Sequence, residues 1–275
     1  MTKCEKSAND FLIDFLWNTM RLALFAAFPQ ELKYIIRNLG IKEKTGRGSF
    51  TIALADLSPS SELVVVESGM GIHNTEAAFS HVVDHYAPDF ILSVGFGGAL
   101  YDGASIGDLV WASTVFLVPG PEERSQLPPP DRWEQFSARA EARDMGLQLS
   151  RQVGMSEGSI LTLTDWLEKP KLIKFVPVEL PFPVSDMETY FFAKLSAEKG
   201  LPFLAVRSIT DSADEEIPRE LLRVTDEAGN YKLPRALGIV LSNPQLIADI
   251  VRLGKNSHIA ARNLWHLVEC LAGIL

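Results

Sequence analysis

The sequence has 275 residues, of which 47% are hydrophobic and 22% charged, and its 35 acidic and 26 basic side chains give a formal net charge of −9. This apolar content excludes an intrinsically disordered chain and allows a sizeable core. An acidic surface argues against sequence-independent nucleic-acid binding, and no apolar run reaches the roughly 20 residues of a membrane-spanning helix.

The N-terminal segment Phe11–Trp17 is apolar but contains Asp14, and it lacks the basic leader and cleavage site of a signal peptide. Ser7–Met20 is predicted to form an amphipathic helix. Core or interface packing is its expected use, and contact with a membrane surface is the alternative. Cys4 and Cys270 fit neither a disulfide framework nor a metal site. We therefore expect a cytoplasmic protein with reduced thiols and no metal.

Six short apolar runs, alternating with helical patterns, predict an α/β fold. The runs are nearly continuous rather than strictly alternating, which indicates strands buried on both faces of a mixed, largely parallel sheet. The predicted strands are Leu22–Ala26, Leu63–Val66, Phe90–Val94, Leu109–Val115, Ile160–Leu163 and Phe203–Arg207. The predicted helices are Gln30–Asn38, Asn74–His85, Trp133–Gln152 and Met187–Lys199.

Two segments fall outside this alternation. Pro119–Asp131 is too rich in proline for a helix or a central strand and is expected to be a surface loop or a lid. Pro234–Leu275 is expected to form two helices separated around Gly254. Because no repeat or linker is visible, we predict a single domain over residues 1–275, with helical extensions at 1–20 and 216–275.

Glycines gather after two of the predicted strands, in Glu67–His73 and in Gly95–Leu100. Glycine lets the backbone approach a ligand closely, and the N-terminus of a helix favours anionic or polar groups. Asn74 and Leu100 occupy the place of the final glycine of the dinucleotide fingerprint, so a Rossmann dehydrogenase is disfavoured. Turn formation alone would also explain either cluster.

Acidic residues lie at the ends of several predicted elements. Asp211 follows a buried strand, where open α/β sheets bind their ligands, although capping of the next helix is an equally simple role. Glu188 begins a helix and Glu31 follows the first strand. Each of these glutamates could serve only as a first-turn acid that interacts with the helix dipole.

Taken in order, five segments resemble the nucleoside phosphorylase and nucleosidase superfamily, above all its methylthioadenosine/S-adenosylhomocysteine nucleosidase branch. They are Glu31, Ser68–Gly71, Gly95–Gly98, Asp186–Glu188 and Arg207–Asp214. The resemblance spans about Arg21 to Asp214 and implies a three-layer α/β/α domain, no cofactor and a homodimer. The tail beyond Glu216, including Asn243–Leu246, is similar to the hopanoid-associated phosphorylase/nucleosidase subgroup.

The resemblance also implies roles for individual residues. Asp211 is the general acid that protonates the purine at N7, which requires a pKa raised by burial or by a neighbouring acid. Glu31 orients or deprotonates the attacking water, whereas Glu188 accepts hydrogen bonds from the ribose hydroxyls and stabilises the cationic sugar. The other implied substrate-binding residues are Met187 at the ribose, Trp166 and Leu167 at the base, Arg207 and Thr210 beside the acid, and Phe96 and Gly97 in the second glycine turn.

Two departures from the family pattern favour water over phosphate as the nucleophile. Phe96 stands where the family commonly has a serine or threonine, and Ala26–Glu31 lacks the glycine-and-arginine phosphate loop of the phosphorylases. Phosphorolysis, with phosphate bound by Arg207 or Arg132, is the nearest alternative.

We therefore expect hydrolysis of the N-glycosidic bond of a purine (adenine) nucleoside. The tail suggests a bulky apolar 5′ group, as in adenosylhopane, in a channel lined by Phe96, Trp166 or the N-terminal helix. A non-catalytic nucleoside-binding module is the third hypothesis. The presence of all three carboxylates, at Glu31, Glu188 and Asp211, argues against it.

Overall fold

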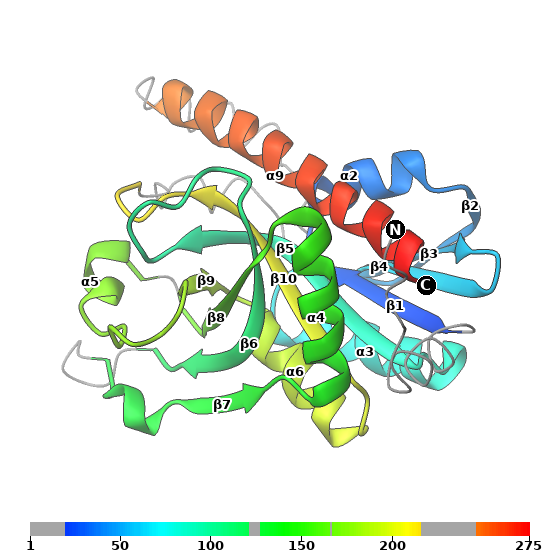
Figure 1. The fold of residues 1–275 in the computed structure, drawn as a ribbon, viewed down its shortest axis with the longest axis horizontal. Coiled ribbons are helices and arrows are strands. Elements are labelled where there is room, and N and C mark those ends of the chain that lie inside the picture. Colours follow the sequence, from blue (N-terminus) through cyan, green and yellow to red (C-terminus); the bar gives the residue numbers. More distant parts are fainter. Residues whose placement is uncertain (1–19, 121–126, 166, 216–245) are drawn as a thin grey trace, which may run out of the picture.

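The computed structural model describes residues 20–120, 127–165, 167–215 and 246–275 (Figure 1). Its elements in chain order are β1 (Arg21–Ala26), α2 (Pro29–Asn38), β2 (Ile41–Arg47), β3 (Phe50–Ser58), β4 (Ser61–Glu67), α3 (Ile72–Tyr86), β5 (Phe90–Ala99), β6 (Leu109–Val118), η1 (Pro130–Arg132), β7 (Glu134–Ser137), α4 (Ala140–Val153), β8 (Ser156–Leu163), α5 (Lys169–Ile173), β9 (Val184–Asp186), α6 (Thr189–Glu198), β10 (Phe203–Asp211) and α9 (Leu246–Ile274).

The described strands form one mixed, ten-stranded sheet with the order β10-β6-β8-β9-β5-β1-β4-β3-β2, and β7 pairs with β6. An additional pairing of β10 with β5 closes β5, β9, β8, β6 and β10 into a ring. Strands β1, β4, β5 and β10 are mutually parallel, whereas β6 and β8 pair in parallel with each other and β6 runs antiparallel to β10. The mixed sheet predicted from the continuous apolar runs is confirmed.

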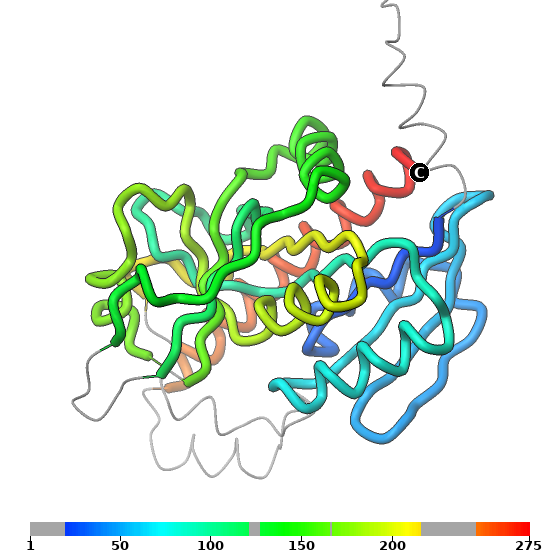
Figure 2. The backbone as a smooth tube through the Cα atoms, turned by 90° about the horizontal axis from the view of Figure 1, so that it is seen from below, coloured from blue at the N-terminus to red at the C-terminus, as the bar shows by residue number. Residues whose placement is uncertain are grey.

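Helices cover both faces of the sheet, so the fold has three layers (Figure 2). Along β1, Leu22 and Leu24 pack into the core cluster shared with α2, α4 and α9, whereas Ala23 and Phe25 pack against α3 and α6. A strand whose successive side chains enter two different cores must be apolar throughout. This explains the continuous runs, and the predicted α/β/α architecture is confirmed.

Each of the six predicted strands is present, as are the helices predicted at Gln30–Asn38, Asn74–His85 and Met187–Lys199. The helix predicted over Trp133–Gln152 is wrong in its first part. Glu134–Ser137 is strand β7, which pairs antiparallel with β6, and the helix begins only at Ala140. The tertiary pairing with β6 therefore overrides the local helical pattern.

The predicted break at Gly254 is also wrong. Helix α9 runs through this glycine without interruption from Leu246 to Ile274. A glycine inside a helix costs about 1 kcal/mol. The buried residues Leu264, Leu267 and Leu271 pack against the sheet core and hold the helix in place.

Besides β7, the sequence does not predict the hairpin of β2 and β3, the three-residue strand β9 or the short helix α5. The β2 strand is mostly exposed and polar, so it lacks the apolar pattern of the central strands. The helix predicted over Ser7–Met20 and the first part of Pro234–Leu275 lie outside the described residues. In the predicted loop, the described part ends in the single 3-10 turn η1. None of the helices in the described ranges is long and apolar enough to cross a membrane.

Candidate active site

The residues singled out from the sequence converge at the carboxyl ends of the parallel strands. Glu31 lies in the first turn of α2, directly after β1, and Gly71 ends the turn after β4. Phe96 and Gly97 lie in the second half of β5. Arg207 to Asp211 form the second half of the neighbouring strand β10. Glu188 caps α6 immediately after β9. Open α/β sheets bind their ligands at this edge.

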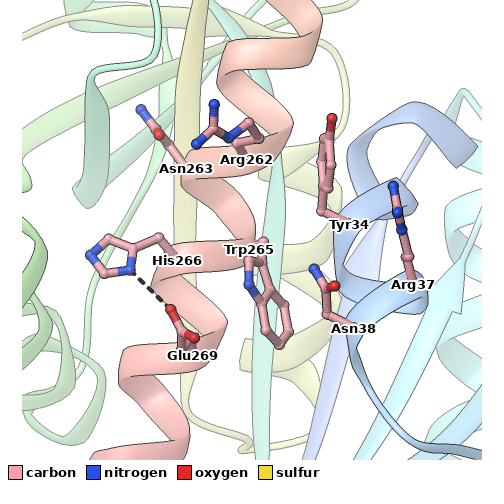
Figure 3. A pocket seen from close by; sticks show the side chains of 8 residues that line it. All are labelled: Tyr34, Arg37, Asn38, Arg262, Asn263, Trp265, His266 and Glu269. Atoms are coloured by element: carbon pink, nitrogen blue, oxygen red, sulfur yellow. Dashed lines mark hydrogen bonds and ion pairs between the residues drawn. The ribbon is translucent and has the colours of Figure 1, made fainter.

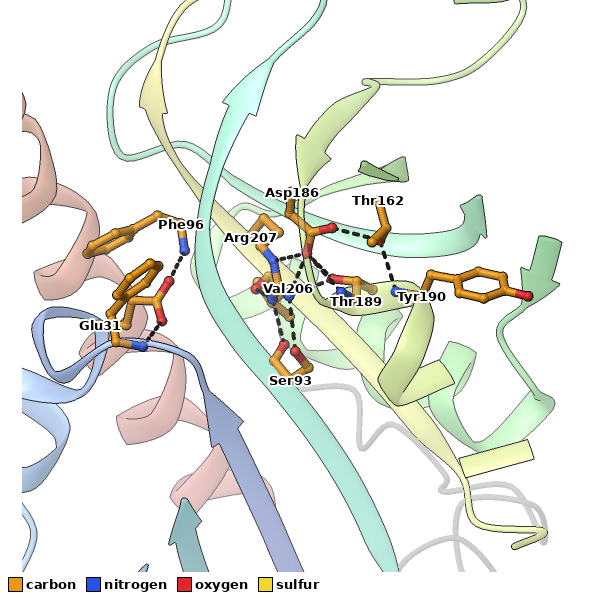
Figure 4. A network of polar contacts seen from close by, with 10 residues as sticks. Glu31, Ser93, Phe96, Thr162, Asp186, Thr189, Tyr190, Val206 and Arg207 are labelled. Carbon is orange, nitrogen blue, oxygen red and sulfur yellow. Dashed lines mark hydrogen bonds and ion pairs between the residues drawn. The ribbon is translucent and has the colours of Figure 1, made fainter. Parts of the chain in front are cut away.

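Glu31 is almost fully buried, at 3% exposure, and its two carboxylate oxygens accept backbone hydrogen bonds. Oε1 accepts from the Phe96 N–H at 2.7 Å and Oε2 from the Phe28 N–H at 2.8 Å (Figure 4). A Cβ atom at Gly95 would lie 2.8 Å from Glu31 Oε1, so only glycine leaves space for this carboxylate. The N-terminus of α2 and strand β5 therefore jointly fix the orientation of Glu31. The second glycine cluster, expected to form a turn, lies inside β5, because its pairing with β10 continues through Gly98.

Glu188 is brought to the same place by the first glycine turn. Its carboxylate accepts a hydrogen bond from the Gly71 N–H. Gly71 has a φ of +83°, a backbone conformation that residues other than glycine rarely adopt. Glu188 is 9% exposed and lies close enough to Glu31 and Asp186 for their charges to act on it. The two glycine clusters thus each position one glutamate.

Burial raises the pKa of both glutamates. The pKa of Glu31 rises from 4.5 to about 7 because burial disfavours its charged form, although the Phe96 and Phe28 N–H groups and Arg207 lower it. The pKa of Glu188 rises to about 8, first through burial and then through the negative charges of Asp186 and Glu31. Near neutral pH, Glu31 is therefore poised to accept a proton, and Glu188 holds one.

A single arginine forms the centre of a polar network next to Glu31 (Figure 4). Arg207 Nε donates to Asp186 Oδ2 at 2.9 Å, and Nη2 lies 2.8 Å from the same oxygen. The four other N–H groups have acceptors in the Ser93 carbonyl and hydroxyl, the Val206 carbonyl and the Thr189 hydroxyl. All five guanidinium donors are thus used within the protein.

Asp211 is the last residue of β10, four residues beyond Arg207. It is only 2% exposed, as the acid role requires, but its neighbour is a base and not the expected acid. Lys169 Nζ lies 2.5 Å from Asp211 Oδ2, and the Thr210 hydroxyl donates to Oδ1 at 2.7 Å. Thr210 is thus beside the acid as predicted, whereas Arg207 is not, because four strand residues span about 13 Å.

The remaining predicted site residues are less closely grouped. Phe96 is half-buried and packs against the core cluster that includes α9, and its backbone N–H donates to Glu31. At Gly97 a Cβ atom would collide with Val184 at 2.4 Å, so strand packing already requires this glycine. Met187 is 40% exposed beside Glu188, and Leu167 packs into a separate apolar cluster. Trp166 lies outside the described residues.

A cavity of about 540 Å³ lies elsewhere, between α2 and α9 (Figure 3). Its lining is polar and includes Arg37, Arg262 and His266, which is paired with Glu269. None of the three carboxylates singled out from the sequence lines it. Arg132, the alternative phosphate-binding arginine, is exposed in η1.

The family model of the phosphorylase superfamily matches residues 21–240. The chain belongs to this superfamily. Among its relatives in this superfamily is a 5′-methylthioadenosine/S-adenosylhomocysteine nucleosidase of Shewanella sp. (strain MR-7), 25% identical over 244 residues that cover 85% of this chain and all of that protein. The nucleosidase of Geobacillus sp. (strain WCH70) is 20% identical and covers 81% of this chain and 99% of its own. The resemblance predicted from the order of motifs is confirmed.

Solved structures show the superfamily fold as well. The 5′-methylthioadenosine/S-adenosylhomocysteine nucleosidase of Neisseria meningitidis has a TM-score of 0.64 at 17% identity, with 93% of this chain and 98% of that chain covered. The futalosine hydrolase of Helicobacter pylori has a TM-score of 0.66 at 17% identity, covering 91% and 98%. At these identities the likeness concerns the fold alone.

Three features of the site are not predicted from the sequence: the Arg207–Asp186 ion pair, the contact of Gly71 with Glu188, and Lys169. Asp186 lies within the motif Asp186–Glu188, so its burial beside Arg207 could have been anticipated. Lys169 follows β8 by six residues and carries no periodic or motif signal. Only the three-dimensional packing of α5 brings it to Asp211.

Proposed function

We propose that this protein hydrolyses the N-glycosidic bond of an adenine nucleoside, with water as the nucleophile and without a cofactor. The purine nucleosidase class is the part that its relatives support directly. The observation that carries the proposal is the pair of buried glutamates at the strand ends. In this pair, Glu31 has a pKa of about 7, and hydrogen bonds from two backbone N–H groups hold its carboxylate in place.

In this mechanism Glu31 accepts a proton from the water that attacks C1′. Glu188 holds the ribose hydroxyls, and Asp211 protonates the leaving purine at N7 so that the base departs neutral. General acid and general base catalysis are each worth about 10²–10⁴ in rate. The roles of these three residues follow from the family resemblance, and their burial at one edge of the sheet supports them.

Arg207 is the observation that favours water over phosphate. A phosphate nucleophile needs N–H donors, but each of the five donors of this guanidinium already has a protein acceptor. The arginine also lies near the carboxyl groups of Asp186 and Glu31, and their negative charges would repel a phosphate dianion. Phosphorolysis is thus the less favoured alternative.

For the substrate we further propose an adenine nucleoside with a bulky apolar 5′ group, such as adenosylhopane. The similarity of the tail to the hopanoid-associated subgroup supports this. The half-exposed Met187 beside Glu188 offers an apolar contact next to the ribose. Phe96 is partly buried against the core, and its place in the channel stays a prediction. A homodimer and a cytoplasmic location remain predictions.

The experiment compares adenosine, methylthioadenosine and a 5′-lipidated adenosine as substrates, each with and without phosphate, and identifies the released base and sugar. We expect phosphate-independent release of adenine, fastest from the substrate with the apolar 5′ group. Release that requires phosphate would refute hydrolysis. Binding without release, with full retention of the nucleoside, would indicate the non-catalytic module.

A further inference from the structure

Lys169 is a buried lysine whose ammonium group has a complete set of acceptors. The residue is 8% exposed at the start of α5. Its Nζ lies 2.5 Å from Asp211 Oδ2, 3.1 Å from the Asp211 carbonyl and 2.5 Å from the Ser212 carbonyl. Three acceptors match the three N–H donors of an ammonium group, so Lys169 is fixed in place against the end of β10.

In β5, Gly98 leaves space for the ion pair of Lys169 and Asp211. A Cβ atom at Gly98 would lie 2.7 Å from Asp211 Oδ2 and 2.9 Å from Lys169 Cε. Any other residue there would force the lysine and the aspartate apart or displace both. Elements from three separate parts of the chain therefore converge on this one ion pair.

The ion pair raises a question of proton supply for the proposed reaction. A general acid must deliver a proton, but both oxygens of Asp211 already accept hydrogen bonds, Oδ1 from the Thr210 hydroxyl and Oδ2 from Lys169. Among the described residues, Lys169 is the cationic group that forms an ion pair with this carboxylate. Its ammonium group is therefore the candidate source of the proton.

We propose that Lys169 acts through Asp211: it positions the carboxyl group and supplies the proton that Asp211 passes to the leaving base. This inference rests on the proposed function. Lys169 Nζ transfers a proton to Asp211 Oδ2 and becomes a neutral amine. As the C1′–N9 bond breaks and its electron pair goes to the purine, Asp211 transfers that proton to N7 and is again a carboxylate. The proton released by the attacking water goes first to Glu31 and returns to Lys169 through solvent, so the cycle closes.

The test separates proton supply from a structural role by means of the leaving group. Methylthioadenosine needs a protonated leaving base, whereas p-nitrophenyl β-D-ribofuranoside releases a stable anion that needs no proton. For Lys169→Met we expect kcat on methylthioadenosine to fall about 100-fold or more, with kcat on the aryl riboside within threefold of the wild type. Lys171→Met is the matched control, because Lys171 lies two residues away in α5 and forms only an exposed pair with Glu168.

A second variant, Lys169→Ala, keeps the test decisive if the aryl riboside is a poor substrate. Added ethylamine should restore its activity on methylthioadenosine at least tenfold and should leave Lys171→Ala unchanged. An unaltered or increased kcat in Lys169→Met, an equal loss on both substrates, or no amine rescue would each overturn the role of Lys169. A wild type that releases base only with phosphate, or not at all, would refute the proposed function instead.

Discussion

Replacing Glu188 by glutamine should make the folded protein more stable, and only at high pH. The folded-state pKa of Glu188 is about 8, above its usual value of 4.5, mainly because burial penalises the carboxylate. The folded state therefore keeps a proton that the unfolded state has already lost. Stability from this group is fully present below pH 4.5 and is lost as the pH rises through about 8.

The magnitude follows from the same two values. At about 1.36 kcal/mol per pH unit, the ionised Glu188 costs the wild type about 4 kcal/mol more at pH 9 than at pH 5. A glutamine has the same shape and carries no charge at either pH. The variant should therefore gain stability over the wild type by up to about 4 kcal/mol between pH 5 and pH 9.

Urea unfolding at pH 5, 7 and 9 measures this difference directly. Glu76→Gln is the matched control, since Glu76 is exposed near the start of α3, and its unfolding curve should follow that of the wild type at each pH. If Glu188→Gln also ran parallel to the wild type from pH 5 to pH 9, Glu188 would not be a buried, destabilised carboxyl group, and the argument for its place in the site would fail.

Three further predictions concern Glu31, Arg207 and Gly95. Glu31→Gln should lower kcat about 10²–10⁴-fold and remove the rise in kcat/KM through pH 7, which a pH profile would reveal; a rise that persists would exclude Glu31 as the base. Arg207→Met leaves Asp186 buried and unpaired, so urea unfolding should show a loss of about 3–5 kcal/mol, against less than about 1 kcal/mol for the exposed Arg143→Met. Gly95→Ala should place a methyl group against Glu31 and lower kcat at least about tenfold with the fold retained in circular dichroism spectra; unchanged kinetics would show that the carboxylate can move.

The central strands could be predicted because a strand that is buried on both faces has an almost continuous run of apolar residues. Leu22–Ala26 is apolar at every position, since its side chains enter two different core clusters. The edge strand β2 and the strand β7 carry no such pattern, because pairing with a neighbour and not burial fixes them. The helix break predicted at Gly254 is wrong for a related reason. The packing of α9 against the core outweighs the free-energy cost of a glycine inside a helix.

The candidate site is only partly predictable from the sequence. Glu31, Glu188 and Asp211 follow strands or begin helices, and such positions meet at one edge of a parallel sheet. Their chemical partners were harder to predict. That Arg207 binds Asp186 and that Lys169 binds Asp211 depends on how β9 and α5 pack, which neither spacing nor periodicity reveals.

Analysis of the reaction products distinguishes hydrolysis of an adenine nucleoside by water from phosphorolysis. Purified protein is incubated with methylthioadenosine in phosphate-free buffer, and Asp211→Asn is the matched variant. We predict release of adenine and the free sugar by the wild type, at a rate that phosphate does not change, and almost none by Asp211→Asn. Adenine release that requires phosphate and yields a sugar 1-phosphate would contradict the account.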